Sequence, residues 1–320
     1  MGILVMYPGP SRVKKAISFE TLENVTFMKI LVATEKPFAK AAVDGIREIV
    51  EGAGYELAAV ADADGLIVRS DKVTREVIDA ARNLKIVVRA GAGYDNVDLA
   101  ACTERGIVVM NTPGQNSNAV AELVVSMMIF ISRNQFTPGT GAEVSGKRLG
   151  IHAYGNVGRI VARYGRALGM SVKAFDPFVD PRQLEADGVE AVGTVEELYA
   201  SSDYVSLHIP ATAQTRGSIG YELLSSMPKG GVLINTARKE VIDEQGLIRA
   251  FEERADLKYI TDIAAEAQPL LTEKFGKRVF ATPKKMGAET AEANLNAGLA
   301  AARQTVDFLK NGNRRFQVNK

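Results

Sequence analysis

Short apolar runs rich in β-branched residues alternate with amphipathic stretches along the chain from position 28 onward. In the first third, these runs predict strands at 29–33, 56–60, 66–68, 85–89 and 107–110. Apolar residues recur every three or four positions between them, which predicts helices at 37–50, 74–82 and 97–104. Alternating strands and helices indicate a parallel sheet with helices on both faces. This first unit is small for a doubly wound domain, and the pattern fits either a compact unit or one that lacks a strand–helix element.

A long apolar helix predicted at 118–133 precedes a second run of the same alternation. Strands are expected at 148–153, 171–175, 204–208, 232–235 and 258–262, with helices at 158–168 and 244–253. A last helix at 291–310 ends at Asn311 and Gly312, a pair typical of a helix C-terminus. The pattern therefore predicts an α/β protein with two doubly wound units, each built on a parallel sheet.

Residues 1–27 stand apart from this alternation. The apolar start of the chain is interrupted by Pro8 and Pro10 and has no basic segment before it, which is not typical of a secretory signal. The first regular strand begins at Met28, so we interpret 1–27 as an N-terminal extension and expect it to be poorly ordered.

The composition is that of a globular protein without a polyanionic partner. Among 320 residues, 46% are hydrophobic and 24% are charged, and the formal net charge is +1, so neither nucleic acid nor an anionic membrane surface is indicated. The longest apolar run, 120–131, contains Glu122 and Ser126 and is too short to span a bilayer. Cys102 is the only cysteine, which excludes an intrachain disulfide and favours a reducing compartment such as the cytosol. No metal site is predicted.

A glycine turn follows the first predicted strand of the second unit and opens the next helix. It consists of Gly155, Asn156, Val157 and Gly158. Dinucleotide-binding folds need one glycine where the backbone approaches the pyrophosphate and another where the helix packs on the strand, and the free N–H groups of the helix start face the phosphates. Asp176 ends the next strand, 21 residues after Gly155, where an acid binds the ribose 2′-hydroxyl and repels a 2′-phosphate. The combination predicts NAD rather than NADP.

One position of this motif departs from the usual pattern. Ala153 occupies the place of the first glycine. Its Cβ is tolerable, at a cost of about 1 kcal/mol, if the turn keeps φ negative there. Two glycines in this spacing also fit a tight strand–helix turn without a ligand, and it is the combination with the strand, the helix and Asp176 that favours a cofactor.

Six further stretches carry a resemblance to a known family. They read LIVRS at 66–70, RAGAGYDNVD at 89–98, NTPG at 111–114, AEL at 121–123, DYVSLHIP at 203–210 and NTAR at 235–238. In this order they resemble the D-isomer-specific 2-hydroxyacid dehydrogenases. The resemblance implies two Rossmann-like domains: a substrate-binding domain from 28–117 plus 295–320, and an NAD-binding domain at 118–294 inserted into it. It also implies a short form, without the regulatory domain of longer relatives.

The resemblance implies roles for residues near the carboxyl ends of strands in the second unit. Arg238 would bind the substrate carboxylate through its planar guanidinium and polarise the forming carbonyl, and a surface arginine after a strand is the alternative. Besides the glycine turn, the positions implied to contact NAD are Asp176, His208, Pro210, Thr236, Ala237, Arg238 and Asp262.

Two arginines that end neighbouring strands of the first unit indicate an anionic substrate. Arg69 and Arg89 supply the positive charge that a phosphorylated hydroxy acid needs. Backbone N–H groups that can form an anion cradle follow at Gly91, Ala92 and Gly93. The resemblance implies that the arginines bind substrate, as in members that oxidise D-3-phosphoglycerate to 3-phosphohydroxypyruvate, the first step of serine biosynthesis. The alternative is that one arginine pairs with Asp71 or Asp95.

The proton-transferring residue is where this sequence departs from the family. Most members place a histidine after a Thr-Pro pair, whereas this chain reads TPKKMGA at 282–288, and its two histidines, His152 and His208, lie elsewhere. A lysine must therefore carry the proton, and counting from the two ends of the stretch selects Lys284 or Lys285. For oxidation its pKa must fall from about 10.4 through burial and nearby arginines. The alternative is two solvated lysines in a protein that has lost catalysis.

The acid that orients the proton carrier is also unusual. The family glutamate falls at Ala267 in this chain, and Glu266 precedes that position by one. Glu266 either pairs with the proton-carrying lysine or is an exposed glutamate at a helix start.

Three functions stay open at this point. The first is oxidation of D-3-phosphoglycerate. The second is the same chemistry on another small hydroxy or keto acid, such as glycerate, glyoxylate, hydroxypyruvate or lactate. The third is a non-catalytic NAD(H)-sensing protein of the same fold, which the missing histidine motivates. The apolar helix at 118–133 is a candidate homodimer contact, or it is buried within one chain.

Overall fold

The computed structural model describes residues 28–33, 38–57 and 62–319. The poorly ordered extension expected at 1–27 and most of the strand expected at 56–60 lie outside these residues. Within the described part of the chain, no helix has both the length and the apolar character that crossing a bilayer requires.

The chain divides into two compact units. Unit 1 comprises the described parts of Met1–Asn116 and Ala291–Lys320, and unit 2 comprises Ser117–Thr290. The chain returns to unit 1 at Ala291 rather than at 295, because helix α11 (Ala291–Asn311) begins there and packs on α1 (Lys40–Gly52).

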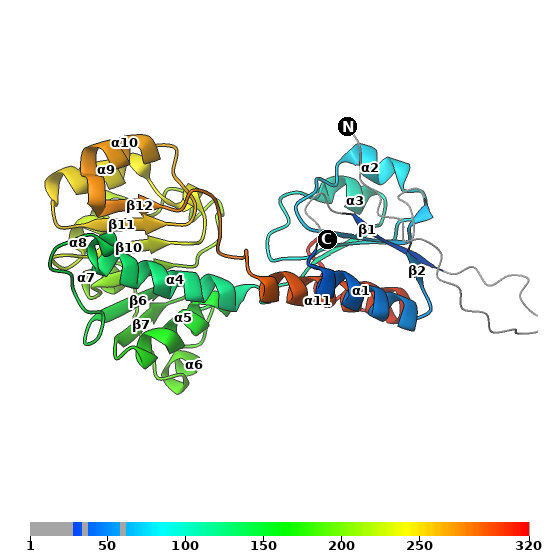
Figure 1. Ribbon diagram of the computed structural model, residues 1–320, viewed down its shortest axis with the longest axis horizontal. Helices are drawn as coiled ribbons and strands as arrows, with labels where there is room; N and C mark the ends of the chain where they lie inside the picture. Colours follow the sequence, from blue (N-terminus) through cyan, green and yellow to red (C-terminus); the bar gives the residue numbers. More distant parts are fainter. Residues whose placement is uncertain (1–27, 34–37, 58–61, 320) are drawn as a thin grey trace, which may run out of the picture. The chain divides into compact units, whose positions relative to one another are not determined.

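Unit 1 is a five-stranded sheet with helices on both faces (Figure 1). Its strands are β1 (Lys29–Ala33), β2 (Glu56–Leu57), β3 (Gly65–Val68), β4 (Ile86–Arg89) and β5 (Val108–Asn111). They lie in the order β2-β1-β3-β4-β5, and every neighbouring pair is parallel. Helices α1 and α11 cover one face, and α2 (Arg75–Ala80) and α3 (Leu99–Glu104) cover the other.

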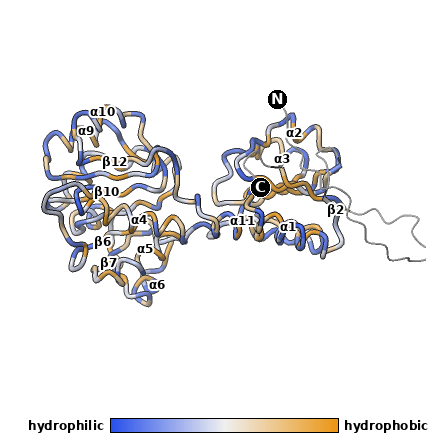
Figure 2. The backbone as a smooth tube through the Cα atoms, viewed as in Figure 1, coloured by the Kyte–Doolittle hydropathy of each residue, from blue (hydrophilic) through white to orange (hydrophobic). Residues whose placement is uncertain are grey.

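Adjacent residues of the central strands in unit 1 face opposite cores, as a period of two requires. In β4, Val88 packs in the core formed with α1 and α11, whereas Val87 packs in the core formed with α2 and α3. Ile67 and Leu66 of β3 divide in the same way. Both faces must therefore be apolar, and the strands of this unit are largely orange in Figure 2. Burial of each such side chain contributes about 1.5–3 kcal/mol.

Unit 2 is a larger parallel sheet of the same kind. Its strands are β6 (Arg148–His152), β7 (Ser171–Phe175), β8 (Glu190–Ala191), β9 (Tyr204–Leu207), β10 (Val232–Asn235), β11 (Lys258–Thr261) and β12 (Val279–Ala281). Their order is β12-β11-β10-β9-β6-β7-β8. Its helices are α4 (Ser117–Ser132), α5 (Asn156–Ala167), α6 (Pro181–Ala186), α7 (Val195–Ala200), α8 (Tyr221–Ser226), α9 (Glu244–Glu253) and α10 (Gln268–Phe275).

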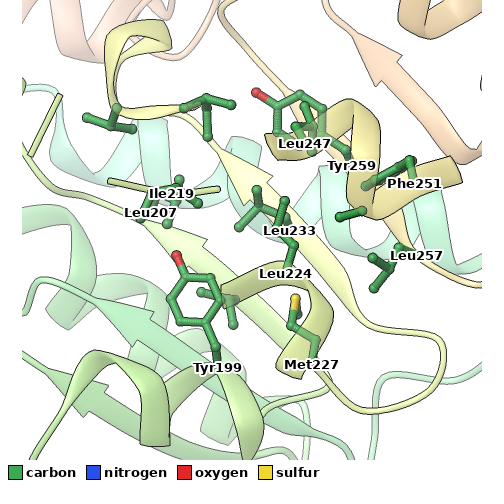
Figure 3. Close-up of a cluster of buried hydrophobic side chains, with 14 of the residues drawn as sticks. Tyr199, Leu207, Ile219, Leu224, Met227, Leu233, Leu247, Phe251, Leu257 and Tyr259 are labelled. Atoms are coloured by element: carbon green, nitrogen blue, oxygen red, sulfur yellow. The ribbon is translucent and has the colours of Figure 1, made fainter. Parts of the chain in front are cut away.

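Two hydrophobic cores lie on the two faces of the seven-stranded sheet. Figure 3 shows part of one, where Leu233 of β10 packs with Tyr199 of α7, Leu224 of α8 and Phe251 of α9. The next residue of the strand, Ile234, faces the other core, with α4 and α5. The alternation again explains why β10 reads as an unbroken apolar run.

Helix α4 buries most of its apolar side chains within unit 2. The fully or almost fully buried ones are Ala121, Val124, Met127, Met128 and Ile131. Leu123 and Phe130 are only partly buried. The helix is therefore mainly a core element, the second of the two roles expected for it.

Several short elements of unit 2 were not expected from the sequence. Helices α6, α7 and α8 have 6 residues each, which is less than two turns and too little for a periodic pattern. The N-termini of α6 and α7 do carry a local signal, because Asp180 accepts a hydrogen bond from the backbone N–H of Arg182, and Thr194 accepts one from that of Glu197.

Candidate functional site

The cofactor-side residues expected from the sequence all follow directly after strands of unit 2. The glycine turn follows β6, Asp176 follows β7, His208 follows β9, Thr236 follows β10 and Asp262 follows β11. These strands are parallel, so all five segments lie at one edge of the sheet. Open α/β sheets bind their ligands at this carboxyl edge.

Glycine is favoured at positions 155 and 158 of the turn for two different physical reasons. A Cβ placed on Gly155 would meet no atom within 4 Å, so the space beside it is open to a ligand. A Cβ on Gly158 would lie 2.3 Å from the carbonyl oxygen of Ala153, so the start of α5 can pack on the strand only with glycine there. The open space and the exposed N–H groups of the helix start fit a pyrophosphate.

Ala153 does not have the backbone conformation expected for it. Its φ is +82°, not negative, and it lies in the left-handed region that favours glycine. An L-residue there costs about 1–2 kcal/mol. Its N–H donates to the carbonyl of Phe175 at 2.9 Å, a contact that ties the turn to the end of β7.

Asp176 lies beside the glycine turn, as its place in the sequence predicts. Its Oδ2 accepts a hydrogen bond from the N–H of Tyr154 at 2.8 Å, and its Oδ1 accepts one from the N–H of Phe178 at 2.9 Å. Two carboxylate oxygens can accept about four hydrogen bonds. The acid is therefore positioned by the backbone and keeps capacity for a ribose hydroxyl.

The segment after β10 is shaped by Asn235, which is fully buried. Its Oδ1 accepts from the N–H of Ala237, and its Nδ2 donates to the carbonyl of Arg238, both at 3.0 Å. Arg238 is partly exposed and donates from Nη1 to the carbonyl of Ala237 at 2.8 Å. Thr236 is 8% exposed, and its buried Oγ1 has no hydrogen-bond partner among the described residues. Such an atom at the carboxyl edge fits a site completed by a polar ligand.

Neither histidine is suited to carry a proton at neutral pH. Burial lowers the pKa of His152 to about 4, and burial lowers that of His208 to about 3. His208 pairs with the hydroxyl of Ser206 through Nε2 at 3.0 Å. Pro210, two residues further on, is exposed. Both imidazoles are neutral in the physiological range.

The lysine loop, residues 282–287 after β12, is anchored at both ends by Asp262. The Asp262 carboxylate is 1% exposed and accepts from Thr282 Oγ1 at 2.9 Å and from the N–H groups of Met286 and Gly287 at 2.8 Å. Its side chain thus holds the lysine loop at both ends.

Lys284 and Lys285 lie between these anchors, and both are exposed. The hydroxyl of Thr282 also donates to the carbonyl of Lys284 at 2.8 Å.

Two alternatives were open for Glu266: pairing with the proton-carrying lysine, or exposure at a helix start. Glu266 is 82% exposed and pairs with Lys239, Oε1 to Nζ, at 3.1 Å. The preceding helix explains why: Glu244, at the start of α9, accepts from the N–H groups of Glu266 and Ala267 at 2.9 and 2.8 Å and holds this backbone beside α9. The second alternative, an exposed glutamate, is the one that the structure has.

Unit 1 brings its two strand-end arginines together. β3 and β4 are paired, and Nε of Arg89 donates to the carbonyl of Arg69 at 2.9 Å. Nη2 of Arg69 donates to Oδ1 of Asn294, from α11, and the guanidinium lies 5.5 Å from the ring centroid of Phe38. Arg69 therefore contacts an amide and an aromatic ring rather than Asp71 or Asp95.

The glycine loop after β4 lies against the Arg89 guanidinium. Gly91 has φ +147°, and a Cβ on it would lie 1.6 Å from Nη1 of Arg89, so a side chain there would be strained and would displace the guanidinium. The carbonyl of Ala92 accepts from Nδ2 of Asn111 at 2.6 Å, which holds the loop as it continues to Gly93. Two cations and a glycine loop in contact make an arrangement suited to an anion.

Four asparagines outside the expected set hold these loops. They are Asn96, Asn111, Asn235 and Asn294. The first three lie in stretches that carry the family resemblance, and Asn96 Nδ2, for example, donates to the carbonyl of Asp71 at 2.7 Å. Asn294 lies far from Arg69 in the sequence and has no local signal.

Comparison with known proteins decides the family. The family model described as "D-isomer specific 2-hydroxyacid dehydrogenase, NAD binding domain" matches residues 121–284. The chain belongs to this family. The match falls within unit 2, which is therefore the family's NAD-binding domain, and the family, the α/β fold and the NAD cofactor expected from the sequence are confirmed.

Similar proteins in this family include several phosphoglycerate dehydrogenases. The D-3-phosphoglycerate dehydrogenase of Methanocaldococcus jannaschii is 38% identical over 269 residues, which are 78% of this chain and 51% of the relative. That of Bacillus subtilis is 34% identical over 296 residues, 85% of this chain and 56% of the relative. The chain thus spans about half the length of the curated relatives it matches.

Solved structures of family members match almost their whole length. The NAD+-bound 3-phosphoglycerate dehydrogenase of Entamoeba histolytica is 51% identical with a TM-score of 0.82, covering 92% of this chain and 99% of that chain. A glyoxylate reductase from Paecilomyes thermophila is 28% identical with a TM-score of 0.74, covering 92% and 98%.

Proposed function

We propose that the chain oxidises D-3-phosphoglycerate to 3-phosphohydroxypyruvate with NAD as the hydride acceptor. One observation carries the choice of substrate: Arg69 and Arg89 lie together at adjacent strand ends, against the glycine loop at Gly91. A phosphate dianion matches two guanidinium groups and backbone N–H donors, whereas a simple hydroxy acid has no second anion for them. The similarity to the Entamoeba histolytica enzyme supports the same substrate.

The reaction gives each group of residues one task. Arg69, Arg89 and the glycine loop bind the phosphate, and Arg238 binds the carboxylate and polarises the forming carbonyl. Lys284 or Lys285 takes the proton of the 2-hydroxyl as its O–H bond breaks. The glycine turn, Asp176 and the segment at Thr236 would hold NAD, which would supply the acceptor for the hydride from C2.

The proton carrier determines the pH dependence. A lysine accepts a proton only in its neutral form, so the oxidative rate rises with pH toward the pKa of that lysine. In the reductive direction the charged lysine donates a hydrogen bond to the carbonyl and then the proton. Because His152 and His208 have pKa values of about 4 and 3, no rate step near pH 6.5 is expected.

Substrate choice is tested by following NADH formation with D-3-phosphoglycerate and with D-glycerate, which lacks only the phosphate. We expect kcat/KM to favour the phosphorylated acid by at least about 100-fold, and Arg69→Gln to remove most of that preference while changing kcat/KM for glycerate little. Equal use of the two acids, or turnover of glyoxylate without turnover of phosphoglycerate, would assign the chain to another substrate of the family.

The proton carrier is tested with the matched pair Lys284→Ala and Lys285→Ala. Loss of one positioned acid–base group lowers kcat by about 100- to 10,000-fold, so we expect a large fall in one variant and a small change in the other. A wild-type protein that binds NADH but turns over none of these acids would instead support the non-catalytic sensing role.

We propose in addition that the enzyme is a cytosolic homodimer of serine biosynthesis. Beyond α4, Phe136 is 71% exposed and packs edge-on against Phe130, with ring centroids 5.2 Å apart, so an apolar surface is available to a second copy. Cys102 is a free, buried thiol, which suits a reducing compartment. Sedimentation velocity tests the assembly: Phe136→Asp should shift a dimer toward the monomer, and a monomeric wild type would contradict it.

A further inference from the structure

The cofactor turn contains a backbone conformation that needs support from its surroundings. Ala153 has φ +82°, where glycine would sit without penalty. Such conformations persist where neighbouring contacts over-determine them. The turn therefore raises the question of what holds Ala153 in place.

Tyr154, the next residue, is held at both its side chain and its backbone. It is 1% exposed, and its phenol donates to Oδ2 of Asp187 at 2.9 Å. Burial and then the contact with Asp187 raise the pKa of Tyr154 to about 12, so the phenol remains a donor at physiological pH. Its N–H donates to Oδ2 of Asp176 at 2.8 Å.

Arg159, in the first turn of α5, closes a cluster around Tyr154. Its Nε donates to the carbonyl of Tyr154 at 3.2 Å, and its guanidinium lies 5.0 Å from the centroid of the Tyr154 ring. Its Nη1 lies 3.6 Å from Oδ2 of Asp187, and its Nη2 donates to Oε1 of Gln183 at 2.9 Å. Gln183 belongs to α6, and Asp187 ends that helix. The cluster thus joins the cofactor turn to the segment that follows Asp176.

We infer that Tyr154 and Asp187 are positioning residues for NAD, which hold the turn at Ala153 in the shape that the pyrophosphate needs. A first glycine adopts that shape by its own preference, whereas Ala153 depends on the buried phenol and its acceptor. The inference rests on the NAD-binding part of the proposed function and does not depend on which acid is oxidised.

The test is a fluorescence titration of NADH with Tyr154→Phe, Ala153→Gly and the double variant. Tyr154→Phe should raise Kd about fivefold, the factor that corresponds to one ordinary hydrogen bond, and Asp187→Ala should act in the same direction. Adding Ala153→Gly to Tyr154→Phe should restore Kd to within about twofold of the wild type, because glycine no longer needs the support.

A matched control variant distinguishes an effect on the shape of the cofactor turn from a general loss of stability. Tyr204 is also a buried tyrosine of unit 2, and its hydroxyl lies 2.8 Å from Oγ of Ser132, on α4. Tyr204→Phe should lower the melting temperature without changing Kd. An unchanged Kd in Tyr154→Phe, or a Kd that Ala153→Gly does not restore, would overturn the inference alone. Failure of the wild type to bind NADH would overturn the proposed function with it.

Discussion

Replacing Asp262 by asparagine should displace the lysine loop and slow the reaction. Asp262 is almost fully buried, and its carboxylate accepts from Thr282 Oγ1 and from the N–H groups of Met286 and Gly287. These contacts lie on both sides of the two exposed lysines. The carboxylate therefore sets where the loop runs, although it is not itself expected to touch substrate.

The size of the effect follows from the hydrogen bonds. An asparagine keeps one acceptor oxygen and places an NH2 group against a donor, so at least one buried N–H group loses its acceptor, at about 1–3 kcal/mol. The remaining bonds lose the assistance of the negative charge. We expect a decrease of about 2–4 kcal/mol in the free energy of unfolding. Because a misplacement of about 1 Å can cost about 100-fold in rate, kcat should fall by about 10- to 100-fold.

The assay compares kcat, measured well below the melting temperature, with urea unfolding of the same variant. Asp203→Asn is the matched control, because Asp203 also accepts three hydrogen bonds, all from Arg148, but at the amino end of β9. It should lose comparable stability with kcat within about twofold of the wild type. If Asp262→Asn behaves in the same way as Asp203→Asn, the loop does not depend on Asp262 and the reasoning fails.

Three further predictions concern the turn, the pH and the anion site. Gly158→Ala brings a Cβ to 2.3 Å from the Ala153 carbonyl and should cost about 1–3 kcal/mol, with weaker NADH binding; urea unfolding with the stability of the wild type would contradict the packing argument. Burial lowers the pKa of His152 to about 4, below its unfolded value of about 6.5. As the pH falls, His152 is therefore protonated in the unfolded chain before it is protonated in the folded protein. Its contribution should lower the free energy of unfolding by about 2 kcal/mol between pH 7 and pH 5. The stability difference between the wild type and His152→Gln should change by that amount, and a constant difference would refute it. Asn294→Ala removes a partner of Arg69 and should raise KM for phosphoglycerate several-fold with kcat and KM for NAD unchanged; an unchanged KM would show that Asn294 does not position the arginine.

The local pattern of apolar and polar residues was enough to predict the α/β architecture. It also predicted the edge of the sheet at which the candidate site residues lie. Alternation of apolar runs with amphipathic stretches indicated parallel sheets, because strands covered on both faces must be apolar throughout, as Leu233 and Ile234 show. Residues that directly follow parallel strands share one edge wherever the strands lie in the sheet. Asp176 and the glycine turn therefore meet, as their positions in the sequence predicted.

The hydrogen-bond and ion-pair partners of individual side chains could not be predicted from the sequence pattern. Glu266 stands near the expected position of an orienting acid, yet Glu244 holds its backbone beside α9, and Lys239 is its partner. Asn294 reaches Arg69 across most of the chain's length. A side chain bonds whichever donor or acceptor the packed backbone places within about 3 Å, and sequence spacing does not report that distance.

The sequence by itself determined the fold class, the family and the kinds of residue available, because period, glycine spacing and strand ends are local properties of the backbone. Only the tertiary structure decided that Ala153 takes a positive φ, that Asp262 holds the lysine loop and that Asn294 is a partner of Arg69. Those outcomes depend on competition among buried polar groups for a limited number of partners, and that competition is resolved only when the elements pack.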